Sequence, residues 1–184
     1  MKINFITGNP QKVAIAQAAL GKDFQILATD IDLPEVQSMA LTEIAIYSAK
    51  KALEIVKEPL ILTDSGFFID ALNGFPGPFV KWTNKTLTNH DFLAMLLNKR
   101  TQKAHTEDCL VYAVPGKKPV IFYSRVSGKV VTEAQQNQSS ISQLFIPDDL
   151  GHPVSHLNFE EEARFWAQHN TNYSQLKAYL LSQK

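Results

Sequence analysis

The chain has 184 residues, and its 18 basic and 18 acidic side chains give a formal net charge of zero. This balance provides no global field that would attract a polyanion, so nucleic acid is disfavoured as a partner. The length fits a single domain over residues 1–184, and no stretch approaches the roughly 18 apolar residues of a membrane span.

Cys109 is the only cysteine. No intramolecular disulfide can form, which favours a reducing compartment such as the cytoplasm. The N-terminal residues lack the apolar core of a secretion signal, so we expect a soluble, untargeted protein. Cys109 lies in a β-rich run, where we interpret it as a core residue and not as a nucleophile.

The first elements predict a parallel βαβ unit. Residues 2–7 alternate as a strand does, and a helical pattern then runs to about residue 20. Residues 24–28 predict a second strand, and the crossover is long enough for the two strands to be parallel. Sheet and helices therefore alternate from the start of the chain.

The turn between that first strand and helix suits a phosphate group. Asn9 stands where a helix N-cap belongs, Pro10 takes the first helical position, and Lys12 projects from the first turn. Unsatisfied N–H groups, the positive end of the helix dipole and an ammonium would then converge. An ordinary well-capped helix is the alternative interpretation.

The next elements are a helix over residues 42–57 and a short apolar strand that ends at Asp64. Open α/β sheets bind their ligands at the carboxyl ends of strands, so Asp64 is a candidate site residue. Beyond it, Pro76-Gly77-Pro78 predicts a stiff loop beside the carboxylate.

Glu35 and Asp64 form a candidate metal pair. Each follows a predicted strand, and if those strands are neighbours both carboxylates reach the same edge of the sheet. Magnesium takes one or two protein carboxylates and completes its shell with water and phosphate oxygens. Two carboxylates are therefore enough for a metal and nucleotide site.

The middle of the chain changes in character. Thr88 predicts the cap of a helix, and residues 105–114 and 120–131 predict a long hairpin in a second lobe. Two further helices follow, one with Phe165 and Trp166 and a last one with Tyr173, Leu176 and Leu180.

Four segments together resemble the inosine triphosphate pyrophosphatase family, whose members remove non-standard purine nucleoside triphosphates. The segments are Phe5-Ile6-Thr7-Gly8-Asn9 with Lys12, Leu33-Pro34-Glu35 with Gln37, Leu62-Thr63-Asp64-Ser65-Gly66, and Gly74-Phe75-Pro76-Gly77-Pro78-Phe79.

The resemblance implies a fold and an activity. The fold would be an elongated mixed β-sheet flanked by helices, with a central cleft between two lobes, one of residues 1–85 with the C-terminal helices and one of about residues 86–150. A homodimer would hydrolyse the bond between the α- and β-phosphates of a nucleoside triphosphate, giving a monophosphate and pyrophosphate. Mg²⁺ would be the cofactor.

The resemblance also assigns site residues. Lys12 and Asp64 would be catalytic, with Asp64 polarising the attacking water, and Asp64 and Glu35 would bind the metal. The substrate-binding residues would be Thr7, Gly8, Asn9, Lys12, Ser65, Gly66, Arg164 and His169.

The chain departs from the family pattern where the base should be recognised. The family's aromatic-glycine-aromatic-aspartate run falls on Ser139-Ser140-Ile141-Ser142, which predicts an altered or relaxed base preference. The alternative is a catalytically weakened nucleotide-binding or regulatory protein of the same fold, and an unrelated α/β hydrolase is a third possibility.

Overall fold

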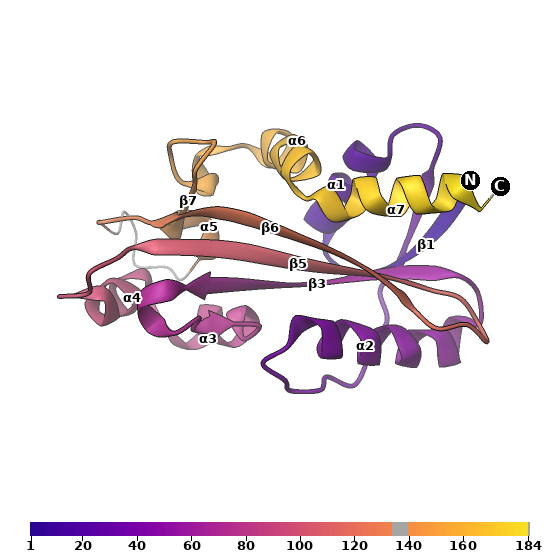
Figure 1. The fold of residues 1–184 in the computed structure, drawn as a ribbon, viewed down its shortest axis with the longest axis horizontal. Helices are drawn as coiled ribbons and strands as arrows, with labels where there is room; N and C mark the ends of the chain where they lie inside the picture. Colours follow the sequence, from indigo (N-terminus) through magenta and orange to yellow (C-terminus); the bar gives the residue numbers. More distant parts are fainter. Residues whose placement is uncertain (134–139, 184) are drawn as a thin grey trace. The chain divides into compact units, whose positions relative to one another are not determined.

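A computed structural model describes residues 1–133 and 140–183, and its secondary structure is mixed α/β (Figure 1). These residues form two compact units that interleave along the chain. Unit 1 comprises residues 1–64, 108–124 and 159–184, and unit 2 comprises residues 65–107 and 125–158. The sequence predicted lobes built from longer continuous ranges, and the single domain over residues 1–184 stays a prediction.

The described strands form one mixed sheet in the order β2-β1-β3-β5-β6-β7, with β4 paired to β3. Strands β3, β5 and β6 contribute residues to both units. The seven strands are β1 (Lys2–Ile6), β2 (Gln25–Thr29), β3 (Leu60–Ile69), β4 (Pro76–Gly77), β5 (Lys103–Ala113), β6 (Val120–Val130) and β7 (Phe145–Pro147).

Unit 1 carries the predicted βαβ unit, because β1 pairs in parallel with both β2 and β3. In Figure 1, α1 and α7 lie on one side of the strands and α2 lies on the other. The helices of unit 1 are α1 (Pro10–Leu20), α2 (Leu41–Val56), α6 (Phe159–His169) and α7 (Thr171–Ser182).

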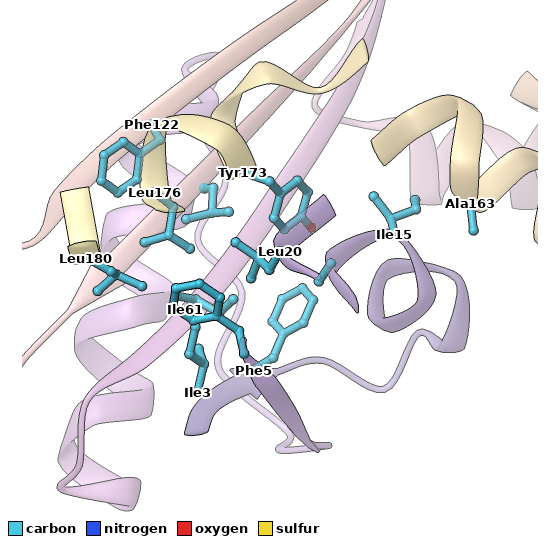
Figure 2. Close-up of a cluster of buried hydrophobic side chains, with 13 residues drawn as sticks. Ile3, Phe5, Ile15, Leu20, Ile61, Phe122, Ala163, Tyr173, Leu176 and Leu180 are labelled. Carbon is cyan, nitrogen blue, oxygen red and sulfur yellow. The ribbon is translucent and has the colours of Figure 1, made fainter. Parts of the chain in front are cut away.

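The main core of unit 1 lies between its strands and the helices α1, α6 and α7 (Figure 2). Large side chains such as Phe5, Leu20 and Leu176 are completely buried there. Full burial of each such side chain stabilises the fold by about 1.5–3 kcal/mol. On α2 the residues Ala45 and Ala49 are also completely buried, as the helical period predicted.

Unit 2 is built from shorter elements. Its helices are α3 (Val80–Thr86), α4 (Asn89–Leu96) and α5 (Ile141–Leu144), with 3₁₀ turns η1 (Asp70–Leu72) and η2 (Val154–His156). Thr88 caps α4, as predicted, through a capping box with Asp91. The rings of Phe67 and Phe145 meet edge to face with centroids 5.3 Å apart.

The sequence predicted most long elements but misjudged one strand. The prediction that a strand ends at Asp64 is wrong, since β3 continues to Ile69. Asp-Ser-Gly is a local turn signal, yet Phe67 and Phe68 beyond it pair with β4 and keep the backbone extended. The elements α3, α5, β4 and β7 were not predicted. Within the described ranges, no helix is long and apolar enough to span a bilayer.

Candidate functional site

The turn between β1 and α1 is closely hydrogen-bonded. Asn9 caps α1 as predicted, since its Oδ1 accepts from the Gln11 N–H at 2.9 Å. The Asn9 N–H in turn donates to Thr7 Oγ1 at 3.1 Å. Pro10 has no N–H and that of Gln11 is already bound, so fewer amides remain for an anion than an uncapped helix start would offer.

Lys12 reaches from α1 to β3. Its Nζ donates to the backbone oxygen of Thr63 at 2.9 Å, in a partly buried position. Thr63 directly precedes Asp64, so the ammonium lies beside the strand position that carries the candidate carboxylate. An ammonium has three donors, and this hydrogen bond uses one of them.

Gly8 is in close contact with Asp30. A Cβ built on Gly8 would lie 2.5 Å from Asp30 Oδ2, which leaves no room for a side chain while the carboxylate keeps this position. Asp30 is an exposed residue just after β2. No local sequence pattern indicates this contact, because it joins two segments through tertiary packing.

Asp64 is half-buried within β3. The parallel pairing of β3 with β1 is described at Leu60 and Ile61, so Asp64 lies past the carboxyl end of that paired stretch. Burial above all, followed by the negative charges of Asp108 and Asp64, raises the pKa of the Cys109 thiol to about 12. Cys109 is therefore a protonated core residue, as predicted.

Glu35 is exposed in the irregular segment between β2 and α2. Its strand is not the neighbour of β3, because β1 lies between β2 and β3. Glu35 and Asp64 were expected to reach the same edge of the sheet if their strands were neighbours, and these strands are not neighbours. The pairing of Glu35 with Asp64 stays a prediction that depends on the path of this segment.

Ser65 and Gly66 belong to unit 2, which begins directly after Asp64. Ser65 is exposed, whereas Gly66 is buried. A Cβ on Gly66 would lie 2.9 Å from the backbone oxygen of Gly77. Gly66 therefore allows β3 to pack closely against β4. The contacts of Ser65 and Gly66 with the substrate stay predictions.

Arg164 and His169 lie on α6, which packs against α1 in unit 1. The Arg164 side chain is 63% exposed and lies 3.9 Å from Glu160 on the preceding turn. His169 Nδ1 lies 2.7 Å from the Phe165 carbonyl oxygen. That oxygen can only accept, so Nδ1 carries the proton and donates. The part that either residue takes in substrate binding stays a prediction.

A buried polar pair that sequence reasoning missed also lies in unit 1. Asn172 Nδ2 donates to the Asp108 carboxylate at 2.6 Å and is 3.2 Å from the Asp108 backbone oxygen. Both residues are buried. The only available signal was an acidic residue inside an otherwise β-rich run, which does not identify its partner.

The segment expected to replace the family's aromatic run is described only in part. Ser139 lies outside the described residues. In unit 2 the Ser140 N–H donates to Asn89 Oδ1 at 3.2 Å, and the hydroxyl oxygens of Ser140 and Ser142 are 2.6 Å apart. Polar hydrogen bonds therefore hold this segment to the start of α4.

Among the described residues, no group of three or more His, Cys, Asp or Glu side chains could hold a metal ion. This finding does not conflict with magnesium, since one or two carboxylates suffice and the ion keeps several water ligands. Asp64 and Glu35 carry the hard oxygen donors that this ion prefers.

Comparisons with known proteins give one consistent result. The profile of the Ham1 family matches residues 3–171. A dITP/XTP pyrophosphatase from Methanopyrus kandleri is 34% identical over 166 residues, which cover 89% of this chain and 88% of that protein. An inosine triphosphate pyrophosphatase from Ajellomyces capsulatus is 38% identical over 131 residues, or 70% of each chain.

Solved structures show the same fold at lower identity. The structure of the Staphylococcus aureus Ham1 protein aligns over 100% of both chains with a TM-score of 0.77 and 20% identity. A HAM1 protein from Coxiella burnetii aligns over 99% of both chains, also with a TM-score of 0.77.

Proposed function

Because the chain belongs to the Ham1 family, we propose that it is a nucleoside triphosphate pyrophosphatase. It hydrolyses the bond between the α- and β-phosphates and releases a nucleoside monophosphate and pyrophosphate. Non-standard purine nucleotides such as ITP, XTP and dITP are the proposed substrates. The names of its relatives, dITP/XTP and inosine triphosphate pyrophosphatase, support this choice.

The observation that carries the proposal is the hydrogen bond from Lys12 Nζ to the Thr63 backbone oxygen. It places an ammonium from the start of α1 beside the strand position that bears Asp64. A triphosphate needs a cation near its oxygens, and a hydrolase needs a carboxylate to orient the attacking water. Both groups occur here within one unit.

Each residue of the proposed site has a separate role in the reaction. Lys12 neutralises charge that develops on the phosphoryl oxygens, and the Thr7–Asn9 turn binds the phosphate chain. Asp64 orients the water that attacks the phosphorus and, with Glu35, would hold Mg²⁺. When bound, that ion would supply positive charge to the phosphate oxygens and lower the pKa of a water ligand.

The test compares Asp64→Asn with the wild type in the presence of magnesium. We expect turnover of inosine and xanthosine triphosphate to fall by roughly 100-fold or more, because the neutral amide can neither bind Mg²⁺ well nor orient the water. Asp23→Asn is the matched control, since Asp23 is an exposed residue of the same unit. Chelation of magnesium should abolish turnover in both proteins.

Turnover by the wild type that survives chelation, together with unchanged turnover in Asp64→Asn, would overturn the proposal. Calorimetry distinguishes the proposed enzyme from the remaining candidate, a catalytically weakened nucleotide-binding or regulatory protein. That candidate requires nucleotide binding by the wild type without any turnover, and the altered Ser140–Ser142 segment is the observation that favours it.

The assembly and location belong to the same proposal. We expect a homodimer, as the family resemblance implies, with a nucleoside triphosphate and not a nucleic acid as its ligand. A single buried cysteine suits the cytoplasm, where thiols stay reduced.

A further inference from the structure

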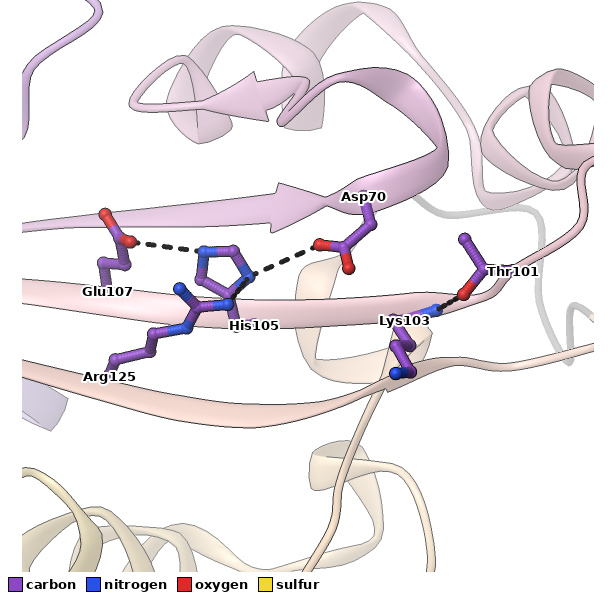
Figure 3. A network of polar contacts seen from close by, with 6 residues as sticks. All are labelled: Asp70, Thr101, Lys103, His105, Glu107 and Arg125. Atoms are coloured by element: carbon purple, nitrogen blue, oxygen red, sulfur yellow. Dashed lines mark hydrogen bonds and ion pairs between the residues drawn. The ribbon is translucent and has the colours of Figure 1, made fainter.

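His105 is a buried histidine in unit 2 that the proposed reaction does not use. It lies on β5, and its ring contacts charged side chains from three strands or their ends (Figure 3). Its Nε2 is 3.2 Å from Glu107 Oε1, and its Nδ1 is 3.1 Å from an Arg125 guanidinium nitrogen. Asp70, just after β3, places Oδ1 3.8 Å from the same Nδ1.

These contacts determine the tautomer. A guanidinium has donors only and cannot be deprotonated in a protein, so Nδ1 must offer its lone pair to Arg125. The single proton of the neutral ring is therefore on Nε2, from which it is donated to the Glu107 carboxylate. In this neutral form Nδ1 accepts from Arg125 and Nε2 donates to Glu107, so both ring nitrogens have a hydrogen-bond partner.

The ring is also held in orientation. It stacks on Phe68 with centroids 5.1 Å apart and an angle of 5° between the planes. The charged groups that face it are Asp70 after β3, Glu107 on β5 and Arg125 on β6. Two anions and one cation surround the ring, and only the cation requires it to be neutral.

We propose that His105 is an acid-sensitive latch in unit 2, which joins β5 to Arg125 of β6 when neutral and turns to Asp70 when protonated. A proton on Nδ1 would point a donor at the Arg125 donors at 3.1 Å, so that hydrogen bond is lost. Asp70 is the nearby acceptor that the new N–H can reach with a small shift. The latch involves no residue of the proposed catalytic site, so it goes beyond the proposed function.

The direction of the pH effect follows from the surroundings. Burial and the Arg125 charge lower the pKa of His105 below its ordinary value of 6.5, although Glu107 and Asp70 oppose the change. The folded protein therefore binds this proton less tightly than the unfolded chain. The stability that the neutral ring contributes is complete above the unfolded pKa and is lost as the pH falls through 6.5 toward the folded pKa.

The first test is a histidine titration by ¹⁵N NMR on the full chain. At about pH 7.5, where a histidine is ordinarily neutral, we expect the wild type to show the Nε2–H tautomer for His105. Arg125→Leu should raise the pKa of His105, and Glu107→Gln should lower it further. His152 and His156, which stack on each other elsewhere in unit 2, should keep the same ring chemical shifts at about pH 7.5 in all three proteins and so report intact folding.

The second test measures amide hydrogen exchange in β5 and β6 at about pH 7.5 and about pH 5.5, expressed as protection factors to remove the intrinsic pH dependence. We expect protection near His105 and Arg125 to fall severalfold at the lower pH in the wild type. His105→Gln should be insensitive, because its amide can accept from Arg125 and donate to Glu107 without titrating. An Nδ1–H tautomer, an unchanged pKa in Arg125→Leu, or the same loss of protection in His105→Gln would each overturn the proposal.

Discussion

Lys12 is the residue whose environment bears most on the proposed chemistry. Its ammonium is partly buried and uses one donor on the Thr63 carbonyl oxygen, so its position is fixed by the protein before any ligand binds. A preorganised cation of this kind stabilises developing negative charge without the cost of reorganisation. The same hydrogen bond also links α1 to β3, so Lys12 contributes to structure as well.

Lys12→Met tests this role. We expect kcat/KM for the best triphosphate to fall by roughly 100-fold, since one preorganised charge on the phosphoryl oxygens is removed. Steady-state kinetics measures the loss, and thermal unfolding shows whether the fold is retained. Lys22→Met is the control, because Lys22 is exposed just after α1. Equal kinetics for the two variants would show that Lys12 is only a structural residue.

Among the elements, the pairing of β6 with β7 depends on a glycine. Gly128 of β6 is paired with Pro147 of β7 and is buried. A Cβ at this position would overlap the backbone oxygen of Ile146 and the ring of Phe145. A backbone oxygen cannot rotate away as a side chain can, so the two strands would have to separate.

We therefore expect Gly128→Ala to lower the free energy of unfolding by about 1–3 kcal/mol, as overpacking of a core does. Chemical denaturation measures the change. Ser127→Ala alters the exposed neighbour on the same strand and should stay within about 0.5 kcal/mol of the wild type. An alanine at residue 128 that is tolerated as well as one at residue 127 would refute the packing explanation.

The elements also show what the sequence could predict. The turn from β1 to α1 was predictable because its signals are local: Asn9 and Pro10 act within one helical turn. The continuation of β3 past Asp64 was not, because a turn signal was outweighed by pairing with β4. The Lys12 contact with Thr63 spans 51 residues and the His105 latch depends on the register of three strands, so neither could be found from local patterns.

For the molecule as a whole, the fold and the proposed activity are inferred from different observations. The solved structures are 20% identical to this chain, and they establish the mixed α/β fold alone. The proposed activity is inferred from residues of the turn after β1, of α1 and of β3 in unit 1, and from relatives that are 30–38% identical. Because the net charge is zero, no global field would attract the proposed triphosphate, and local cations such as Lys12 would have to hold it.

The products of nucleotide hydrolysis distinguish the proposed reaction from its rivals. Purified protein is incubated with inosine or xanthosine triphosphate and magnesium, and the products are resolved by anion-exchange chromatography with ³¹P NMR. We expect the nucleoside monophosphate and pyrophosphate in equal amounts, with no diphosphate intermediate. A nucleoside diphosphate with orthophosphate, or no hydrolysis of any nucleoside triphosphate, would contradict the proposed activity.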